Sequence, residues 1–365
     1  MKIDFPTDHE SIINRIATID PLQYGKTRNF INGCVTYLSP YISRGVISTK
    51  QVLESVLRNG FTISEIESFV KELCWRDYFQ RVGQAKNLDH DIKQAQSPIS
   101  NNAIPINIVN GSTGIEGIDN AIETLKDKGY MHNHCRMYTA SLVCNIAQSH
   151  WKQPAQWMYY HLLDGDFASN ICSWQWVAGA NSNKKYYANQ ENINKYTFTN
   201  QQKTFLDTSY EELVNSTIPK ELSETTIFKE TTKLPEPNLI VFDSALPTFI
   251  YNYYNLDPLW HQSEKANRIL LLDPDFFGAY PISSKCVDFM LALSKNITGI
   301  QVYIGSFKSF AEQFECKSIC FKEHPLNIGY IGVEESRDWI SPVITGYYPS
   351  FFAYWKKMEQ QIKKQ

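Results

Sequence analysis

The chain has 365 residues, 43% of them hydrophobic, which predicts a large buried core and excludes an intrinsically disordered protein. Its 35 Lys and Arg residues against 38 Asp and Glu residues give a formal charge of −3, so any nucleic-acid-binding surface must be a local basic patch. The aromatic share of 13% suits a helical protein whose rings pack on one another or on a planar ligand.

The first half of the sequence, residues 1 to about 195, has the apolar spacing of helices. One helix is predicted over residues 64–82, where Ser64 and Glu67 have the spacing of a capping box. Residues 86–112 are polar and predict a loop. Further helices are predicted over residues 118–126, 132–150 and 154–163. These elements predict a helical domain over residues 1–196.

The second half has a different pattern. Residues 197–237 are rich in Thr, Glu, Lys and Asn, which predicts a covering segment and linker. Short apolar runs then alternate with helical patterns, which predicts a small parallel α/β domain over residues 238–345 and a last helix over residues 346–365. The predicted strands are 239–242, 269–272, 300–303 and 318–321, and the predicted helices are 283–294 and 307–314. The fold class is therefore mainly α, with a small C-terminal α/β domain of Rossmann-like type.

Several sequence features bear on location and cofactors. There is no apolar signal region at the N-terminus and no run of 18 apolar residues, so we expect a cytoplasmic protein without a transmembrane helix. The eight cysteines include no CxxC pair, and we expect them to be reduced. No GxGxxG and no GxxxxGK[ST] occurs, so neither of those nucleotide sites is expected. Without a coiled-coil pattern, we expect a monomer.

A first cluster of chemically active side chains lies within the predicted helix 64–82. Glu72, Trp75 and Arg76 have the spacing of one helix face, which carries a carboxylate, an indole and a guanidinium. Taken alone, this pattern favours a surface ion pair between Glu72 and Arg76 beside a core tryptophan.

A second cluster occupies residues 129–137. Asn133, Arg136 and Met137 share a helix face, which suits the wall of a ligand pocket. A metal site is not expected, because the side chains at positions 132, 134 and 135 cannot converge on one ion from a helix.

A third cluster follows at residues 164–176. Asp164 and Asp166 form a DxD pair that could bind magnesium beside phosphates or orient polar ligand groups by hydrogen bonds. Trp174 and Trp176 are two residues apart and point about 200° from each other on a helix, so one can face inward while the other faces a cavity.

Together these clusters resemble the FAD-binding helical domain of the photolyase/cryptochrome family. The resemblance rests on ELCWRDYF, GYMHNHCRMYTAS and HLLDGDFASNICSWQW, in this order, and on YGKTRN and TYLSPY upstream. It covers about residues 20 to 195 and implies FAD bound in a U shape inside a helical bundle. The family splits pyrimidine dimers in DNA by light-driven electron transfer from reduced FAD, and this is the implied function. A cryptochrome-like photoreceptor without repair activity is the alternative.

The resemblance implies which residues hold FAD. Asn170 matches the residue that faces flavin N5, where an amide can accept a hydrogen bond from a protonated N5. The DxD pair matches positions at the flavin and ribose edges, which favours hydrogen bonding over magnesium. The complete set of implied FAD-binding residues is Tyr24, Thr36, Leu38, Ser39, Arg76, Asn133, Arg136, Asp164, Asp166 and Asn170.

The resemblance also implies a substrate cavity lined by Glu72, Trp75, Asn133, Met137 and Trp176. An extruded dimer needs aromatic walls in place of its lost stacking, and a carboxyl can hydrogen-bond a pyrimidine carbonyl. Family members that repair the (6-4) lesion have histidines where Asn133 and Met137 stand, so the implied lesion is the cyclobutane pyrimidine dimer. The candidates for contacts with DNA phosphates are Arg28, Lys184 and Lys185.

Photoreduction in the family uses a relay of tryptophans. Trp174 and Trp151 match its proximal and middle members, whereas the distal position falls near Ile108, where no tryptophan stands. The relay therefore ends at Trp151 or detours through Trp157 or Tyr159.

Two departures from the family pattern remain. The family usually has an α/β antenna domain before the FAD domain, whereas here the α/β region follows it, as a relocated counterpart, a remnant or an unrelated domain. The sequence identifies no antenna chromophore. Residues 184–194 faintly resemble the iron–sulfur branch of the family, but no cysteine occurs between Cys172 and Cys286, so a cluster is not expected.

Overall fold

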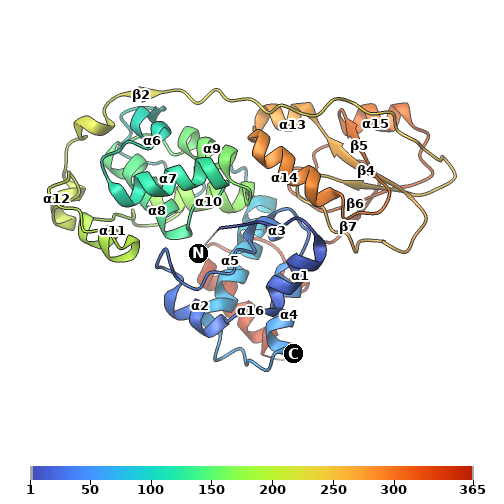
Figure 1. Ribbon diagram of the computed structural model, residues 1–365, viewed down its shortest axis with the longest axis horizontal. Coiled ribbons are helices and arrows are strands. Elements are labelled where there is room, and N and C mark those ends of the chain that lie inside the picture. The colour runs from blue at the N-terminus through green and yellow to red at the C-terminus, as the bar shows by residue number, and fades with distance from the viewer. Residues whose placement is uncertain (1–2, 364–365) are drawn as a thin grey trace. The chain divides into compact units, whose positions relative to one another are not determined.

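The computed structural model of the chain describes residues 3–363 (Figure 1). Contacts divide the chain into two compact units. Unit 1 consists of the residues up to Asp4, Lys26–Val35 and Lys86–Glu230, and unit 2 consists of Phe5–Gly25, Thr36–Ala85 and the residues from Thr231 onward. Most of the N-terminal residues up to Ala85 therefore belong to the same unit as the C-terminal region.

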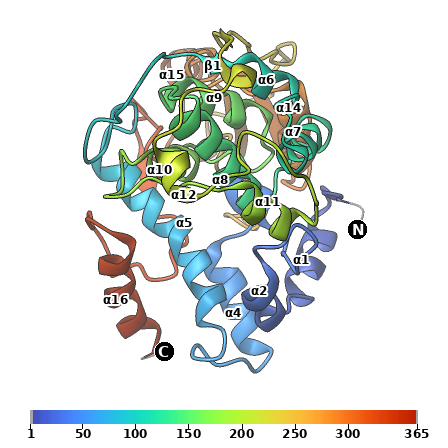
Figure 2. The ribbon, with the colours of Figure 1, turned by 90° about the vertical axis from the view of Figure 1, so that its left-hand side faces the viewer.

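Unit 1 is helical, and its centre is formed by α8, the π-helical turn η1 and α10, which pack on one another. Helix α7 packs on α8, and α9 packs on α10 (Figures 1 and 2). A small antiparallel pair joins β1 to β2. The elements are β1 (Ile104–Pro105), α6 (Ile106–Asn110), α7 (Glu116–Lys128), α8 (Asn133–Ser141), η1 (Leu142–Ile146), α9 (Lys152–His161), α10 (Phe167–Ala178), α11 (Gln190–Thr197), α12 (Tyr210–Val214), the 3-10 turn η2 (Lys220–Leu222) and β2 (Thr225–Thr226).

Local sequence explains where the helices of unit 1 begin and end. Gly129 ends α7 with a φ of 67°, and a Cβ at this position would lie 2.7 Å from the Leu163 side chain, so only glycine fits. The helices predicted over 118–126 and 154–163 are confirmed as α7 and α9. The helix predicted over 132–150 is wrong in its last part, because α8 passes into η1 and the helical backbone stops at Ile146. The loop predicted over 86–112 contains β1 and α6.

Unit 2 contains helices from both ends of the chain. Helix α5 starts three residues later than predicted. The predicted capping box of Ser64 and Glu67 is wrong, because Glu65 accepts hydrogen bonds from the N–H and the hydroxyl of Thr62 and α5 begins only at Glu67. The helices are α1 (His9–Ala17), α3 (Ser39–Ser43), α4 (Thr49–Arg58), α5 (Glu67–Ala85) and α16 (Phe351–Ile362), and α2 (Pro21–Thr27) crosses the boundary between the units.

The C-terminal region of unit 2 contains a parallel five-stranded sheet with the order β5-β4-β3-β6-β7. Numbered by appearance, this order is 3-2-1-4-5, which is a doubly wound sheet whose order reverses beside β3. Helix α15 covers one face, where Phe307 and Phe310 pack on Ile250, Ile269 and Leu271. The elements are β3 (Thr248–Tyr251), β4 (Asn267–Leu272), α13 (Pro274–Ala279), α14 (Ser284–Ser294), β5 (Ile300–Ile304), α15 (Phe307–Gln313), β6 (Ile319–Lys322) and β7 (Val333–Glu335).

Three of the four predicted strands are confirmed as β4, β5 and β6, and both predicted helices as α14 and α15. The strand predicted over 239–242 is wrong. Leu239 and Val241 are 93% and 77% exposed, and the backbone of Val241 bonds the side chain of Gln301 instead of a neighbouring strand. The first strand of the sheet is β3, which the sequence analysis missed.

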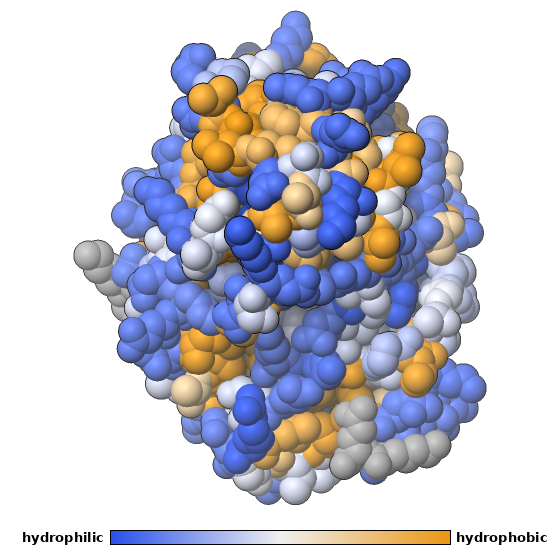
Figure 3. Space-filling model, turned by 90° about the vertical axis from the view of Figure 1, so that its right-hand side faces the viewer, coloured by the Kyte–Doolittle hydropathy of each residue, from blue (hydrophilic) through white to orange (hydrophobic). Residues whose placement is uncertain are grey.

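The α/β region exposes apolar side chains, which gather on the face shown in the upper part of Figure 3. The exposed apolar residues of this region include Leu239, Val241, Ile328, Ile331 and Val333. Within residues 3–363, none of the helices combines the length and the apolar character that crossing a bilayer requires.

Candidate functional site

A buried ion pair joins two of the predicted clusters in unit 1. Arg136 on α8 donates from Nη2 to both carboxylate oxygens of Asp164 at 2.9 Å, and from Nε to the carbonyl of Met131 at 2.8 Å. The side chain of Asp164 is 2% exposed and that of Arg136 is 21% exposed. Each charge depends on the other in such surroundings, because removing one partner leaves a buried charge uncompensated.

The start of α10 carries the next group of polar side chains. Asp166 caps the helix, because its Oδ1 accepts from the N–H of Ser169 at 2.7 Å. The Ser169 hydroxyl is buried and has no hydrogen-bond partner among the residues that the structure describes. Asn170 donates from Nδ2 to the carbonyl of Ala155 at 2.9 Å. Its Oδ1 is therefore the amide atom that can accept a hydrogen bond from a ligand.

These contacts bear on the two interpretations of the DxD pair. Asp164 is engaged by Arg136 and Asp166 by the first turn of α10, so both carboxylates already have partners in the protein. Over residues 3–363, no group of three or more His, Cys, Asp or Glu side chains is arranged to hold a metal ion. The geometry favours hydrogen bonding over magnesium.

The side chains of His132, His134 and Cys135 each have surroundings of their own. Nδ1 of His134 lies 2.9 Å from the carbonyl of Asn29, so this nitrogen carries the proton. Nδ1 of His132 accepts from the backbone N–H of His134 at 3.2 Å and caps α8. Burial raises the pKa of the Cys135 thiol to about 12, so it stays protonated.

Burial lowers the pKa of His132 from 6.5 to about 4, helped by the neighbouring charges of His134 and Arg136. Between pH 6.5 and pH 4, the imidazole of His132 binds a proton in the unfolded chain but stays neutral in the folded protein. The free energy of unfolding therefore falls as the pH falls. We expect His132 to account for a loss of about 2–3 kcal/mol in the free energy of unfolding between pH 7 and pH 4.

Urea unfolding at a series of pH values measures this loss. The variant His132→Asn keeps a capping acceptor but cannot titrate, so its stability should fall less between pH 7 and pH 4 than that of the parent. If parent and variant lost equal stability over this range, His132 would not be the group responsible.

The two tryptophans of α10 differ in exposure as their spacing predicted. Trp174 is 2% exposed, whereas Trp176 is 39% exposed and packs beside the ring of Tyr186. On α8, Met137 is half-buried and Asn133 is exposed. Helix α10 thus carries one indole that is buried in the core of unit 1 and one that a ligand can reach.

Trp151 lies in the core of unit 1 and has a partner that the sequence analysis missed. Its Nε1 donates to Oδ1 of Asp91 at 2.6 Å. A carboxylate at this distance stabilises positive charge on an indole that gives up an electron. Asp91 has no local sequence pattern that would reveal this contact, because it lies in the segment predicted as a polar loop. Trp157 is buried as well, and its Nε1 has no hydrogen-bond partner among residues 3–363.

Helix α5 carries the predicted cluster of unit 2. Glu72, Trp75 and Arg76 are all half-buried, so none is a fully solvated surface residue. Arg76 donates from Nη1 to the hydroxyl of Ser43 at 2.8 Å, which ties α5 to α3.

The upstream residues of the predicted FAD site are also in unit 2. Tyr24 packs edge-on against Phe69, with ring centroids 5.1 Å apart. The backbone around the helix start at Ser39 offers few free N–H donors. Pro40 has no N–H group, and the N–H groups of Leu38 and Tyr41 are bonded within the segment. The hydroxyls of Thr36 and Ser39 are the better candidates for a phosphate.

The candidate DNA-binding residues of unit 1 differ in exposure. Lys184 is exposed and Arg28 is half-buried. Lys185 lies with its side chain against Gly179, and burial lowers its pKa. Lys184 is therefore the residue of the three best exposed to a phosphate.

Comparison with known proteins places this arrangement in a family. Residues 69–226 match the family described as the FAD binding domain of DNA photolyase. Over these residues the chain is similar to the photolyase/cryptochrome family. FAD is the cofactor of this domain.

Similar proteins include the deoxyribodipyrimidine photo-lyase of Alkalihalophilus pseudofirmus, which is 29% identical over 155 residues, 41% of this chain and 32% of that one. The deoxyribodipyrimidine photo-lyase of Buchnera aphidicola subsp. Baizongia pistaciae is 31% identical over 161 residues, 41% of this chain and 33% of that one. A solved Synechocystis sp. cryptochrome has a TM-score of 0.46 and 23% identity, and the match covers 53% of this chain and 44% of that one. This chain spans about one third of the length of the two photo-lyases it matches.

The match to the photolyase domain takes in α5 and most of unit 1 and extends beyond residue 195, into the segment predicted to cover the helical domain. Tyr24, Thr36, Leu38 and Ser39 precede the matched residues, so their contact with FAD remains a prediction. The α/β region and α16 follow the matched residues.

Proposed function

We propose that this protein uses light to split cyclobutane pyrimidine dimers in DNA, with reduced FAD as the electron donor. The observation that carries the proposal is the group formed by Arg136, Asp164, Asp166 and Asn170 within a photolyase-type FAD-binding domain.

The orientation of Asn170 supports FAD at this site. Its Nδ2 is bound to the carbonyl of Ala155, so the amide presents Oδ1, an acceptor, to a ligand. An acceptor suits a protonated flavin N5 and adds no charge, which favours the reduced over the oxidised flavin. The contact with Ala155 also fixes the amide, so no reorganisation is required when FAD binds.

The neighbouring groups support the same assignment. Arg136 and Asp164 compensate each other's charge, so the pair can donate and accept hydrogen bonds beside a flavin without leaving an isolated buried charge. The unpartnered hydroxyl of Ser169, one residue before Asn170, can bond a polar group of FAD. In unit 2, Arg76 and the hydroxyls of Thr36 and Ser39 are proposed to bind the phosphates and the ribityl chain.

Bound FAD, when reduced and excited by light, would supply the electron that opens the cyclobutane ring and would take it back afterwards. The residues of the chain would bind and orient the dimer. Trp75 and Trp176 would replace the stacking that the extruded bases lose, and Glu72 would donate a hydrogen bond to a pyrimidine carbonyl. Asn133 and Met137 would complete the cavity, and Lys184 would contact the phosphates.

Two other roles are proposed for parts outside this site. Trp174 and Trp151 would pass electrons to the flavin, and Asp91 would stabilise the oxidised indole of Trp151. The doubly wound order of the sheet supports the interpretation of the α/β region as a relocated counterpart of the family's α/β domain, rather than a remnant or an unrelated domain.

A repair assay with the full chain tests the proposal. The protein is incubated with dimer-containing single- and double-stranded DNA under blue light and in darkness, and the remaining dimers are counted. We expect loss of dimers only under light. Flavin photochemistry with unchanged DNA would contradict repair and support a photoreceptor, and DNA containing only (6-4) lesions serves as the control for lesion choice.

A further inference from the structure

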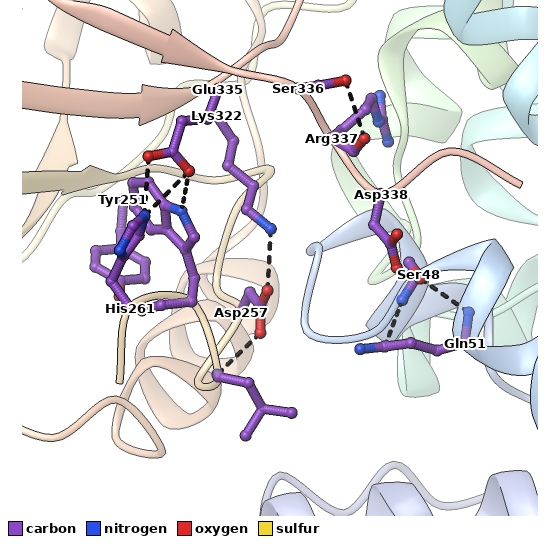
Figure 4. Close-up of polar contacts among 12 residues, drawn as sticks. Ser48, Gln51, Tyr251, Asp257, His261, Lys322, Glu335, Ser336, Arg337 and Asp338 are labelled. Carbon is purple, nitrogen blue, oxygen red and sulfur yellow. Dashed lines mark hydrogen bonds and ion pairs between the residues drawn. The ribbon is translucent and has the colours of Figure 1, made fainter. Parts of the chain in front are cut away.

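The C-terminal segment of unit 2 lies along α5, the helix that carries Glu72, Trp75 and Arg76. After β7 the chain passes the start of α4, where Asp338 accepts a hydrogen bond from Ser48 (Figure 4). The N–H of Ile340 donates to Oδ2 of Asp77 at 3.0 Å, and the hydroxyl of Tyr78 donates to the carbonyl of Tyr348 at 3.3 Å. Helix α16 then packs against α5.

At the start of α16, Phe351 stacks on Trp75. The ring centroids are 3.8 Å apart and the planes differ by 9°, so one face of the indole is covered by the phenyl ring. Phe351 itself is buried. The rings of Tyr78 and Phe79 also pack against Trp75, with interplanar angles of 75° and 40°. Together with Phe351 they form an aromatic cluster around the indole. These contacts fix the plane of the indole, whose side chain is half-buried.

We propose that Phe351 is a positioning residue for the substrate, acting through Trp75. This inference rests on the proposed function, in which the indole of Trp75 packs against an extruded pyrimidine. An indole that is held in one orientation loses no rotational freedom when a base stacks on it, so binding becomes tighter. Phe351 lies outside the match to the photolyase domain, which ends at residue 226. It also gives a function to the segment GYYPSFFAYW.

The test uses the full chain and three substitutions in α16. Phe351→Leu keeps much of the buried volume and removes the ring, Phe351→Tyr keeps the ring, and Phe352→Leu changes the adjacent phenylalanine, which is 70% exposed. KM and kcat for light-driven repair of a dimer-containing oligonucleotide, and the FAD content, are measured for each protein. Aromatic pairs contribute enough for us to expect KM to rise about three- to tenfold in Phe351→Leu, with kcat and FAD content little changed. Phe351→Tyr and Phe352→Leu should have parental values.

A double-mutant cycle with Trp75→Leu separates positioning from general packing. If Phe351 acts through Trp75, Phe351→Leu should have no further effect on KM in the Trp75→Leu protein. An unchanged KM in Phe351→Leu, or an equal rise in KM with and without Trp75, overturns this inference while repair by the parent stands. A parent protein that binds FAD and repairs no dimers overturns the proposed function instead, and this inference with it.

Discussion

Replacing Asp164 by alanine is expected to remove most of the bound FAD. Within residues 3–363, Asp164 supplies the carboxylate that pairs with Arg136, and its side chain is 2% exposed. Breaking a buried ion pair costs about 3–5 kcal/mol, because the remaining charge has no partner. This cost exceeds two powers of ten in a binding constant. FAD released by heat denaturation and measured by fluorescence gives the occupancy.

The neighbouring variants separate loss of FAD from loss of the fold. Asp164→Asn keeps the shape and part of the hydrogen bonding, so we expect intermediate occupancy. Asp89→Ala removes an ion pair with Lys152 in which both side chains are more than a third exposed, and it should retain FAD. Full FAD occupancy in a folded Asp164→Ala protein would show that the pair with Arg136 does not hold the cofactor.

The second large effect is expected on the substrate side, where Glu72→Ala should lower the yield of repair about tenfold or more while FAD stays bound. The carboxyl of Glu72 is proposed to donate a hydrogen bond to the dimer as charge develops on it, and alanine cannot do this. Glu72→Gln keeps a neutral donor and should repair better than Glu72→Ala. The quantity measured is the number of dimers split per photon absorbed by the flavin.

A matched control for Glu72 lies on the same helix. Glu67 in the first turn of α5 pairs with Lys71, and its side chain is 43% exposed. Glu67→Ala should therefore change the yield less than twofold. Equal repair by Glu72→Ala and the parent would remove Glu72 from the mechanism, whatever the result for Glu67.

Sequence patterns anticipated the parts of the fold that depend on near neighbours. The two-residue spacing of Trp174 and Trp176 on a helix predicted that one faces inward and the other does not, and their exposures of 2% and 39% agree with it. Strands β4, β5 and β6 were predicted from their apolar runs. The missed strand β3 and the strand wrongly predicted over residues 239–242 also have local explanations. β3 is only four residues long, and the equally short run at 239–242, with Leu239 and Val241 exposed, is the more apolar of the two.

The residues of the candidate site also fall into two groups, those that short sequence motifs indicate and those whose contacts depend on tertiary packing. The positions of Arg136, Asp164 and Asn170 could be anticipated because short motifs surround them. The stack of Phe351 on Trp75 and the hydrogen bond from Trp151 to Asp91 could not, because each joins residues far apart in the sequence that only tertiary packing brings together.

The central claim is that the Arg136, Asp164, Asp166 and Asn170 group holds FAD in a form ready for photochemistry. The most direct measurement is the absorption spectrum of the purified full chain, followed by heat release and quantification of its chromophore. We predict a flavin spectrum and one FAD per chain, reducible by blue light in the presence of an external thiol. A folded, colourless protein that takes up no FAD from an excess in solution would contradict the account.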